Sequence, residues 1–336
     1  MKKRRISLIL CAILLVLSCA GCTQNESSES FPYIVSANAG EGTVTAYVCN
    51  RFDEELQEST DGELSGHVYL NGTLGNDTDV AEQVMSGHVQ FLCTNTANLV
   101  TIIPELAVLD MPGVLTSLNQ ARGVMDNPEF RSKLDEIFEE HGLKLLILSD
   151  QGFRQTSSNK ALNTLEDFKG LDIRTMENSL HMAYWNALGA NATPMNRSEV
   201  FISLQQGLLE AQEDPYCSIL ANNYAEVQKY IIETNHIFSN VIFITNLDYY
   251  NSLSEEHQQE MQQVCADLLE ESRQYCDESN ESALTEMQEQ GMEYIKIDEA
   301  ELERIGQVAQ EKVEPLVREQ AGDEMTDLFL NIAQQE

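Results

Sequence analysis

The stretch that decides the fold runs from Gly170 to Pro215 and reads GLDIRTMENS at residues 170–179, ALGANATPMNRSEVFISLQQG at residues 187–207 and LLEAQEDP at residues 208–215. Leu171–Thr175 is an apolar-rich run behind a glycine, which predicts a short buried strand. Arg174 lies inside this run. A buried guanidinium is costly unless an anion meets it, and its planar fork suits a carboxylate. By itself the residue leaves two interpretations open, a structural ion pair or a clamp for a carboxylate ligand.

Further blocks with a definite order flank this stretch: LNGTLGND at residues 70–77, EQVMSGHVQF at 82–91, GFRQTSSNK at 152–160 and EVQKYIIETNH at 226–236. Together the blocks resemble the solute receptors of tripartite ATP-independent periplasmic (TRAP) transporters of the DctP type. The core of these receptors reads roughly DLKGLKIR, GA-x-PTPM-x-x-x-EV, LQ-x-G-x-x-DGQENP and EVQKY-x-x-x-TNH. The resemblance covers nearly the whole mature chain and implies that Arg174 is the main clamp for a ligand carboxylate.

The N-terminus reads as a processing signal. Residues 2–5 are basic, residues 6–17 are almost unbroken apolar, and small residues precede Cys22. This pattern is similar to a bacterial lipobox with Cys19 in place of the usual leucine, so residues 1–21 are predicted to be a lipoprotein signal peptide and Cys22 the lipidated residue. Ordinary secretory cleavage and an uncleaved anchor remain alternatives. Residues 22–30 are polar without periodicity, which indicates a flexible tether. We therefore expect an extracytoplasmic protein, lipid-anchored to the outer face of the cytoplasmic membrane or periplasmic.

Composition favours a globular domain beyond the signal, because no second apolar run approaches membrane length. The chain has 20 basic and 55 acidic residues, and four of the basic ones lie in the signal, which leaves a net charge of −39 on the mature chain. Such a charge argues against nucleic acid and anionic lipid surfaces as partners. An anion site on this chain must therefore be locally positive.

No catalytic, metal or cofactor pattern stands out. The six histidines are scattered, and neither HExxH nor G-x-S-x-G occurs. Five cysteines remain for the folded part, without C-x-x-C spacing. Cys265 and Cys276 fall on one predicted helix, about 16 Å apart at ~1.5 Å per residue, which is too far to bridge. We expect most cysteines to be small buried side chains, with a Cys93–Cys217 bridge as the open alternative.

Alternating strands and helices indicate an α/β architecture with a parallel core sheet. Strands are predicted at residues 31–38, 67–70 and 89–93, and helices at 43–58 and 79–85. Asn127 and Pro128 open a helix that ends at Gly142. Residues 143–148 are nearly continuously apolar, which is typical of a central parallel strand. Polar residues 149–152 and the region 239–247 predict two crossings between two lobes, as in binding proteins that close by hinge motion.

The C-terminal part is predicted to be helical. Ser252 and Glu255 form a capping box that opens a long helix, which the resemblance implies spans both lobes of a periplasmic-binding-protein-like fold. Further helices are expected at residues 301–317 and 324–332. The expected division is lobe I at residues 31–151 plus 240–279 and lobe II at residues 152–239 plus 280–333.

The resemblance also assigns the remaining site residues. Arg154 matches a second cleft arginine, although a charge near the hinge would explain it too. Asn95 falls where sugar-acid receptors carry an acid. Glu177 could accept a hydrogen bond from the ligand, and Tyr216 supplies aromatic surface, as do Tyr184 and Trp185, which can equally be packing residues. The remaining candidates lie in loops that face the cleft in the family and could instead serve turns: Asn38, Asn76 and Asp77.

Two departures from the family pattern stand next to Arg174. Arg197 replaces an aromatic residue after PTPM, and Asp214 replaces the asparagine of QENP. In one interpretation the two pair and leave the net charge of the site unchanged. In the other, Arg197 takes a second anionic group of the ligand while Asp214 or Glu177 accepts from a hydroxyl or an ammonium. Both predict a ligand more polar than a simple aliphatic keto acid.

We therefore interpret the chain as a TRAP solute-binding lipoprotein, not an enzyme. It would capture a small organic acid by hinge closure and deliver it to the membrane subunits of the permease. A ligand-sensing receptor of the same fold that feeds a membrane histidine kinase is the alternative, and a secreted hydrolase is disfavoured by the missing catalytic set.

Overall fold

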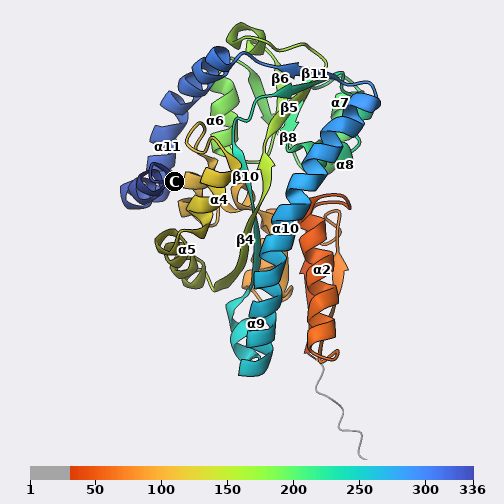
Figure 1. Ribbon diagram of the computed structural model, residues 1–336, viewed down its shortest axis with the longest axis vertical. Helices are drawn as coiled ribbons and strands as arrows, with labels where there is room; N and C mark the ends of the chain where they lie inside the picture. The colour runs from red at the N-terminus through yellow and green to blue at the C-terminus, as the bar shows by residue number, and fades with distance from the viewer. Residues whose placement is uncertain (1–30) are drawn as a thin grey trace, which may run out of the picture.

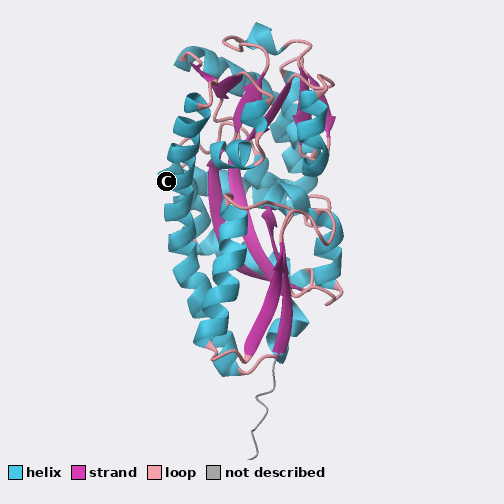
Figure 2. Cartoon of the chain, turned by 90° about the vertical axis from the view of Figure 1, so that its right-hand side faces the viewer, coloured by secondary structure: helices cyan, strands magenta, loops and turns pink. Residues whose placement is uncertain are grey.

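The computed structural model describes residues 31–336, and the predicted signal, tether and lipidation site at Cys22 lie outside this range. Two β-sheets lie one above the other, with helices against their faces (Figures 1 and 2). This is the predicted two-lobed α/β architecture. We call the part built on the five-stranded sheet lobe I and the part built on the six-stranded sheet lobe II. Between residues 31 and 336, every helix is either too short or too polar to cross a membrane.

The sheet of lobe I has the order β2-β1-β3-β10-β4. The first three strands are parallel, whereas β10 runs antiparallel to both β3 and β4. The strands are β1 (Phe31–Ser36), β2 (Leu64–Tyr69), β3 (Phe91–Asn95), β4 (Leu143–Phe153) and β10 (Phe238–Asn246). Helices and 3₁₀ turns connect them: α2 (Val44–Ser59), α3 (Asp77–Met85), η1 (Thr96–Leu99), η2 (Pro104–Asp110), α4 (Leu118–Asp126), α5 (Pro128–Glu140) and α9 (Leu247–Ser252).

The prediction of a central parallel strand at residues 143–148 was wrong. The strand exists as part of β4, but it lies at the edge of the sheet and pairs only with β10, antiparallel. Its apolar run has another cause: helices α4, α5 and α10 pack against β4 and bury it. The continuous apolar run of β4 therefore reflects burial of both faces of the strand and not a central position in the sheet.

Local signals placed the helix starts well. Thr43 caps α2 by accepting from Ala46 N, and Asn127 caps α5 with Pro128 at its first position, as predicted. These caps satisfy backbone N–H groups that have no partner inside the helix.

The sheet of lobe II has the order β11-β9-β5-β8-β6-β7. Strand β6 pairs in parallel with β7 and β8, and β5 runs antiparallel to β8 and β9. Its strands are β5 (Gln155–Ser158), β6 (Asp172–Thr175), β7 (Asn191–Pro194), β8 (Ala211–Asp214), β9 (Tyr230–Glu233) and β11 (Glu293–Lys296). The connecting elements are η3 (Leu165–Phe168), α6 (Ser179–Ala187), α7 (Arg197–Gln205), α8 (Tyr216–Ala221) and η4 (Tyr224–Glu226).

Three segments join the lobes. The chain passes from β4 directly into β5 and returns from β9 into β10, and helix α10 (Glu255–Glu289) runs along both lobes (Figure 1). This helix packs against α2 and β4 in lobe I and against α8 in lobe II, which confirms the predicted spanning helix. Its cap was predicted wrongly: Ser254, not Ser252, accepts from His257 N, because Ser252 still belongs to α9.

The last helix, α11 (Glu299–Ala333), is two helices joined at a kink. Gly322 adopts φ 80° and ψ 158°, which glycine tolerates without a steric penalty. The two predicted C-terminal helices are thus present, with the break between them. Helix α11 contacts α6 of lobe II and also η2 and α4 of lobe I. The residue boundaries between the lobes stay a prediction.

Buried apolar side chains fill both lobes. Trp185 and Tyr184 are buried in the larger cluster and contact each other edge to face at 4.9 Å between ring centroids, so they are packing residues. All five cysteines of the described part are buried free thiols, Cys93 and Cys217 included, so the alternative of a bridge between these two is not realised.

Candidate functional site

A cleft opens where the carboxyl ends of strands from both lobes face each other. Its empty volume is about 510 Å³ when the open solvent at its mouth is included. Residues at the carboxyl ends of strands, or in the loops and helical turns that come after them, line the cleft. In lobe I they come from the region of β1, β2 and β3, with Gln151 of β4, and in lobe II from the region of β6, β7 and β8. Ligands of open α/β sheets bind at this end of the strands. The lining residues are Asn38, Ala39, Thr45, Asp77, Thr94, Asn95, Asn98, Gln151, Arg174, Met176, Glu177, Met195, Asn196, Arg197 and Ser218.

Arg174 is the buried cation of this cleft without an acidic partner. Its Nε and Nη2 donate to the carbonyl oxygen of Met195 at 3.0 and 2.8 Å, and its Nη1 has no hydrogen-bond partner within residues 31–336. The side chain is 3% exposed, and burial lowers its pKa because neighbouring groups do not compensate fully. A buried donor held in place by a carbonyl oxygen is an arrangement that an incoming carboxylate would complete.

Arg197 and Asp214 form an ion pair on the lobe II side of the cleft. Nη1 of Arg197 lies 2.8 Å from Oδ2 of Asp214, and Nη2 lies 3.4 Å from Oδ1. Asp214 is buried behind Arg197, and although burial lowers the pKa of Arg197, Asp214 raises it more. Of the two interpretations that the sequence left open, the structure shows the pairing.

Arg154 lies deeper, in a buried cluster between the lobes. Its Nε contacts a carboxylate oxygen of Glu213, its Nη2 donates to the carbonyl oxygen of Glu213 at 2.7 Å, and the same nitrogen lies 3.2 Å from Oδ1 of Asp214. His236 Nε2 lies 3.1 Å from Glu213 Oε2, and His181 Nδ1 lies 3.6 Å from Oε1. Despite burial, the charge of Arg154 and the hydrogen bonds from His181 and His236 hold the pKa of Glu213 well below its usual range.

His181 extends this cluster to lobe I. Its Nε2 lies 3.3 Å from Oδ1 of Asp110, at the end of η2. Burial lowers the pKa of His181, but Asp110 and Glu213 raise it more, to about 9. The imidazole is therefore protonated at neutral pH and bridges a carboxylate of each lobe. Asn178 of lobe II adds a second link, because its Nδ2 donates to Oδ2 of Asp110 at 2.9 Å.

Asp77 is the acid of the lobe I wall. Thr94 Oγ1 donates to its Oδ1 at 2.6 Å and Asn38 Nδ2 donates to its Oδ2 at 3.2 Å. Burial raises its pKa, and these two donors together with the charge of Arg197 oppose the shift only in part. Within residues 31–336, no Lys, Arg or His nitrogen lies within 4 Å of this carboxylate. Asp77 and Arg174 thus face one cleft, and neither has an ion-pair partner within 4 Å among the described residues.

Two amides lie at the point where the chain crosses between the lobes. Gln151 Nε2 donates to Thr45 Oγ1 at 3.2 Å and to Asn95 Oδ1 at 3.4 Å, while its Oε1 accepts from Ser218 Oγ of lobe II at 3.0 Å. Asn95 Nδ2 donates to Ser239 Oγ and to the carbonyl oxygen of Asn240. Asn95 therefore lines the cleft as predicted, but its amide is occupied by contacts at the crossing.

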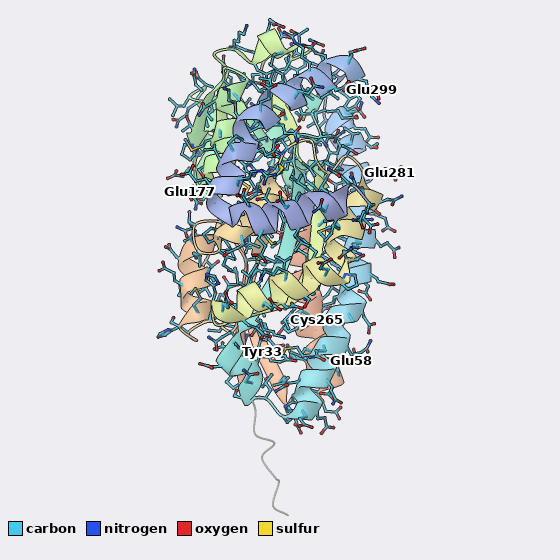
Figure 3. All side chains as sticks on the ribbon, turned by 90° about the vertical axis from the view of Figure 1, so that its left-hand side faces the viewer. Tyr33, Glu58, Glu177, Cys265, Glu281 and Glu299 are labelled. Carbon is cyan, nitrogen blue, oxygen red and sulfur yellow. The ribbon has the colours of Figure 1, made fainter. Side chains whose placement is uncertain are left out.

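Six predicted site residues meet in the cleft lining: Asn38, Asp77, Asn95, Arg174, Glu177 and Arg197. Glu177 is exposed and lies at the edge of the molecule where the two lobes meet (Figure 3). Four others lie outside the lining, so their predicted contact with a ligand has no support here. Arg154 and Asp214 are in the buried cluster, Asn76 caps α3 by accepting from Asp79 N, and Tyr216 packs among apolar side chains.

The sequence interpretation missed several polar residues of the site. Thr45, Thr94, Asn98, Gln151 and Ser218 line the cleft. The one available signal was position: Thr94 precedes the predicted Asn95, and Gln151 lies in the polar turn recognised as a crossing. The cluster partners His181, Glu213 and His236 were missed because their partners are distant in the chain. No group of three or more His, Cys, Asp or Glu in residues 31–336 is placed to hold a metal ion.

Comparison with known proteins supports the same conclusions. The family model for bacterial extracellular solute-binding protein, family 7 (DctP), matches residues 35–322. A solute-binding protein of Verminephrobacter eiseniae is 31% identical over 251 residues, which are 74% of this chain and 75% of that protein. The 2,3-diketo-L-gulonate-binding periplasmic protein YiaO of Escherichia coli is 29% identical over 246 residues, 73% of this chain and 75% of YiaO.

A solved structure shows the same arrangement of lobes. The sugar acid binding protein DctPAm from Advenella mimigardefordensis, in complex with galactonate, superimposes with a TM-score of 0.85 at 26% identity. The superposition covers 91% of this chain and 99% of that protein.

Proposed function

The chain belongs to the DctP family of bacterial extracellular solute-binding proteins, the receptors of TRAP transporters, and on that premise we propose that it captures a small organic acid in the cleft between its lobes. The acid would enter with its carboxylate toward lobe II. The closed receptor would then deliver it to the membrane subunits of the permease.

The observation that carries this proposal is the state of Arg174. Its guanidinium is buried in the cleft wall, its Nη1 has no partner among the described residues, and its pKa is lowered. An isolated buried charge is costly to a protein that does not use it. A ligand carboxylate would supply the missing acceptor and, at low local dielectric, a strong ion pair.

Relatives support the ligand class. YiaO is named for binding 2,3-diketo-L-gulonate, and DctPAm is in complex with galactonate. Both ligands carry one carboxylate and several hydroxyl or carbonyl groups. The lining of the present cleft is also mostly polar, with amide side chains on both walls, threonines in lobe I and a serine in lobe II.

We also propose that the lobes close on the ligand. The joining segments β4–β5 and β9–β10 can act as hinges, because they are short and lie side by side. Gln151 sits at this point and contacts both lobes. Closure would exclude water from the Arg174 ion pair and strengthen it.

A lipid on Cys22 is part of the same proposal, since a receptor of a cell without an outer membrane would be lost by diffusion if it had no anchor. Cells that express the full chain and the Cys22→Ala variant can be fed labelled palmitate and fractionated. We expect label and membrane association in the parent protein alone. Label in both proteins would contradict lipidation at Cys22 without affecting the proposal of ligand binding.

The direct test is a thermal-shift screen of residues 31–336 with monocarboxylates, dicarboxylates, sugar acids and amino acids. An acid at a hundredfold excess over its dissociation constant adds about 2.7 kcal/mol of stability to the parent protein. Arg174→Met should abolish this gain, and Arg174→Lys should retain part of it, because lysine keeps the charge but loses the fork.

Arg304→Met is the matched control. Arg304 is a half-exposed surface arginine paired with Glu166, and its loss changes the net charge equally. We expect the control to respond to the acid like the parent protein. An acid that stabilises the parent and Arg174→Met to the same extent would refute the role of Arg174.

A further inference from the structure

We propose that the Arg197–Asp214 pair makes the cleft selective for monocarboxylates and that Asp214 is the residue that sets this selectivity. The inference rests on the proposed function and deepens it. It starts from Arg197, an arginine of the cleft lining, and from Asp214, the buried acid that is paired with it.

Lobe II places three arginines and two acids near the cleft, and two of the arginines are paired with the acids. Arg154 is paired with Glu213, and Arg197 is paired with Asp214 through two nitrogen–oxygen contacts of 2.8 and 3.4 Å. These two acids neutralise two of the three arginines. The third, Arg174, has the carbonyl oxygen of Met195 as its acceptor and no acid within 4 Å in the described chain. Lobe II therefore offers one uncompensated positive charge to a ligand.

The opposite wall makes a second negative charge unfavourable. Asp77 lies in this wall, where Thr94 and Asn38 donate to its carboxylate and no Lys, Arg or His nitrogen of the described residues lies within 4 Å of it. The distal carboxylate of a dianion would meet either Asp77 or the already neutralised Arg197. Like charges that face each other across an interface cost several kcal/mol, and such a repulsive element is how a site excludes a competing ligand.

The ion pair with Asp214 leaves Arg197 able to donate hydrogen bonds to a ligand. Asp214 is 1% exposed and fixed from behind by Arg154, with 3.2 Å between Arg154 Nη2 and its Oδ1. Arg197 lines the cleft and still has N–H groups that do not face Asp214. It can therefore donate to a hydroxyl or a carbonyl oxygen of the ligand while contributing almost no net charge. The expected ligand is a monocarboxylate with polar substituents.

Asp214→Asn tests the idea as a gain of function. It leaves a side chain of the same shape and frees the charge of Arg197, so a second carboxylate gains a cation. Isothermal titration of residues 31–336 should use two matched pairs of probes: galactonate with galactarate, and 4-hydroxybutyrate with succinate. In each pair the molecules differ in whether the far end is a hydroxyl or a carboxylate.

We expect the parent protein to bind the monoanion of a pair more tightly. In Asp214→Asn the ratio of the two affinities should move toward the dianion by roughly tenfold or more, since the like-charge penalty is partly removed. A gain of affinity for a dianion cannot come from partial unfolding of the variant. The double variant Arg197→Tyr with Asp214→Asn removes both charges and should return the ratio toward that of the parent.

Glu199→Gln is the matched control, because it removes one negative charge from an exposed position on α7, the helix of Arg197, outside the cleft lining. It should leave the ratio within about threefold of the parent, since exposed charges are screened by water and salt. An equal shift in Glu199→Gln would mean that total charge, not the pair, sets selectivity, and would overturn the inference.

Two other results would also overturn it: a parent protein that binds the dianion of a pair at least as tightly as the monoanion, and an Asp214→Asn variant with an unchanged ratio. Both leave the proposed capture of an acid intact, because binding and its dependence on Arg174 are measured separately. If none of the four probes binds the parent or the variant and no acid of the wider screen stabilises the protein, the proposed function fails and the inference fails with it.

Discussion

Two groups of buried charges lie next to each other in this protein and are built in opposite ways. In the cluster between the lobes, Arg154, Glu213, His181 and Asp110 alternate in sign, and each charge has a partner of the other lobe or the next strand. In the cleft, Arg174 and Asp77 are held by neutral groups alone. Arg154 and Arg174 are equally buried, at 1% and 3% exposure. Pairing rather than burial separates a structural arginine from one that is available to a ligand.

The direction of the pKa shift reflects the same difference. Burial lowers the pKa of each guanidinium, but Glu213 and Asp214 more than compensate for Arg154, so its pKa rises. For Arg174 the compensation is incomplete and the pKa falls. A ligand carboxylate beside Arg174 would raise the pKa of its guanidinium, as Glu213 and Asp214 do for Arg154.

The largest expected effect is on stability through the cluster. Arg154→Met leaves Glu213 and Asp214 buried with fewer cations, and removing one partner of a buried pair costs about 3–5 kcal/mol. Urea unfolding of residues 31–336 measures this loss in the free energy of unfolding. The exposed pair of Arg304 with Glu166 provides the contrast, since Arg304→Met should cost at most about 1 kcal/mol. Equal losses in both variants would remove the distinction between the buried and the exposed pair.

A smaller effect is expected in the pH dependence of stability. The pKa of His181 is about 9 in the folded protein and 6.5 in the unfolded chain, so its contribution is complete below pH 6.5 and disappears as the pH rises toward 9. His181→Gln should lower the free energy of unfolding at pH 6 by about 1.5–3 kcal/mol, the usual value for hydrogen bonds to charged groups. The variant should also flatten the decline between pH 6.5 and 9.

His236 acts in a different pH range and does not obscure this result. Burial lowers its pKa despite Glu213, so its contribution is present above pH 6.5 and is lost as the pH falls below that value. Urea titrations at intervals from pH 5 to pH 10, with the parent and His181→Gln side by side, separate the two. An unchanged slope above pH 6.5 in the variant would show that His181 is not the bridging cation.

The smallest expected change is in the stability of Arg174→Met without ligand. Methionine removes an uncompensated buried charge and fills part of its volume, and such replacements are often neutral or stabilising. We expect a free energy of unfolding within about 1 kcal/mol of the parent, or above it. A loss as large as that of Arg154→Met would mean that Arg174 is a structural residue. Ion pairing would then not distinguish the two buried arginines.

Surface charge follows a simpler rule than either cluster. Acidic side chains such as Glu58, Glu281 and Glu299 point outward into water (Figure 3). Their number gives the chain its strong net negative charge, which repels an anionic solute at long range. The unpaired Arg174 makes the attraction local, within the cleft.

Much of the fold was predictable because its signals are local. Asn127 and Pro128 open α5 through contacts with residues two and three positions away, and strand β6 lies in the short run behind Gly170. Two crossings and the long helix α10 were also expected, although the return lies between β9 and β10, at residues 234–237, and not at 239–247. One error was local, because Ser254 rather than Ser252 caps α10. The other was non-local: the apolar run of β4 comes from burial by α4, α5 and α10, and a hydrophobic run cannot tell whether a strand lies in the middle or at the edge of a sheet.

The sequence by itself determined the family, the order of the elements and the place of Arg174 on the clamp strand. The tertiary structure decided what each charged residue does. Arg197 and Asp214 are 17 positions apart, Arg154 and Glu213 are 59 apart, and His181 and Asp110 are 71 apart. Whether such residues meet depends on how the elements of lobe II align and, for His181 and Asp110, on how the two lobes are placed. A charge left without a partner can therefore be recognised only after every other charge has been placed.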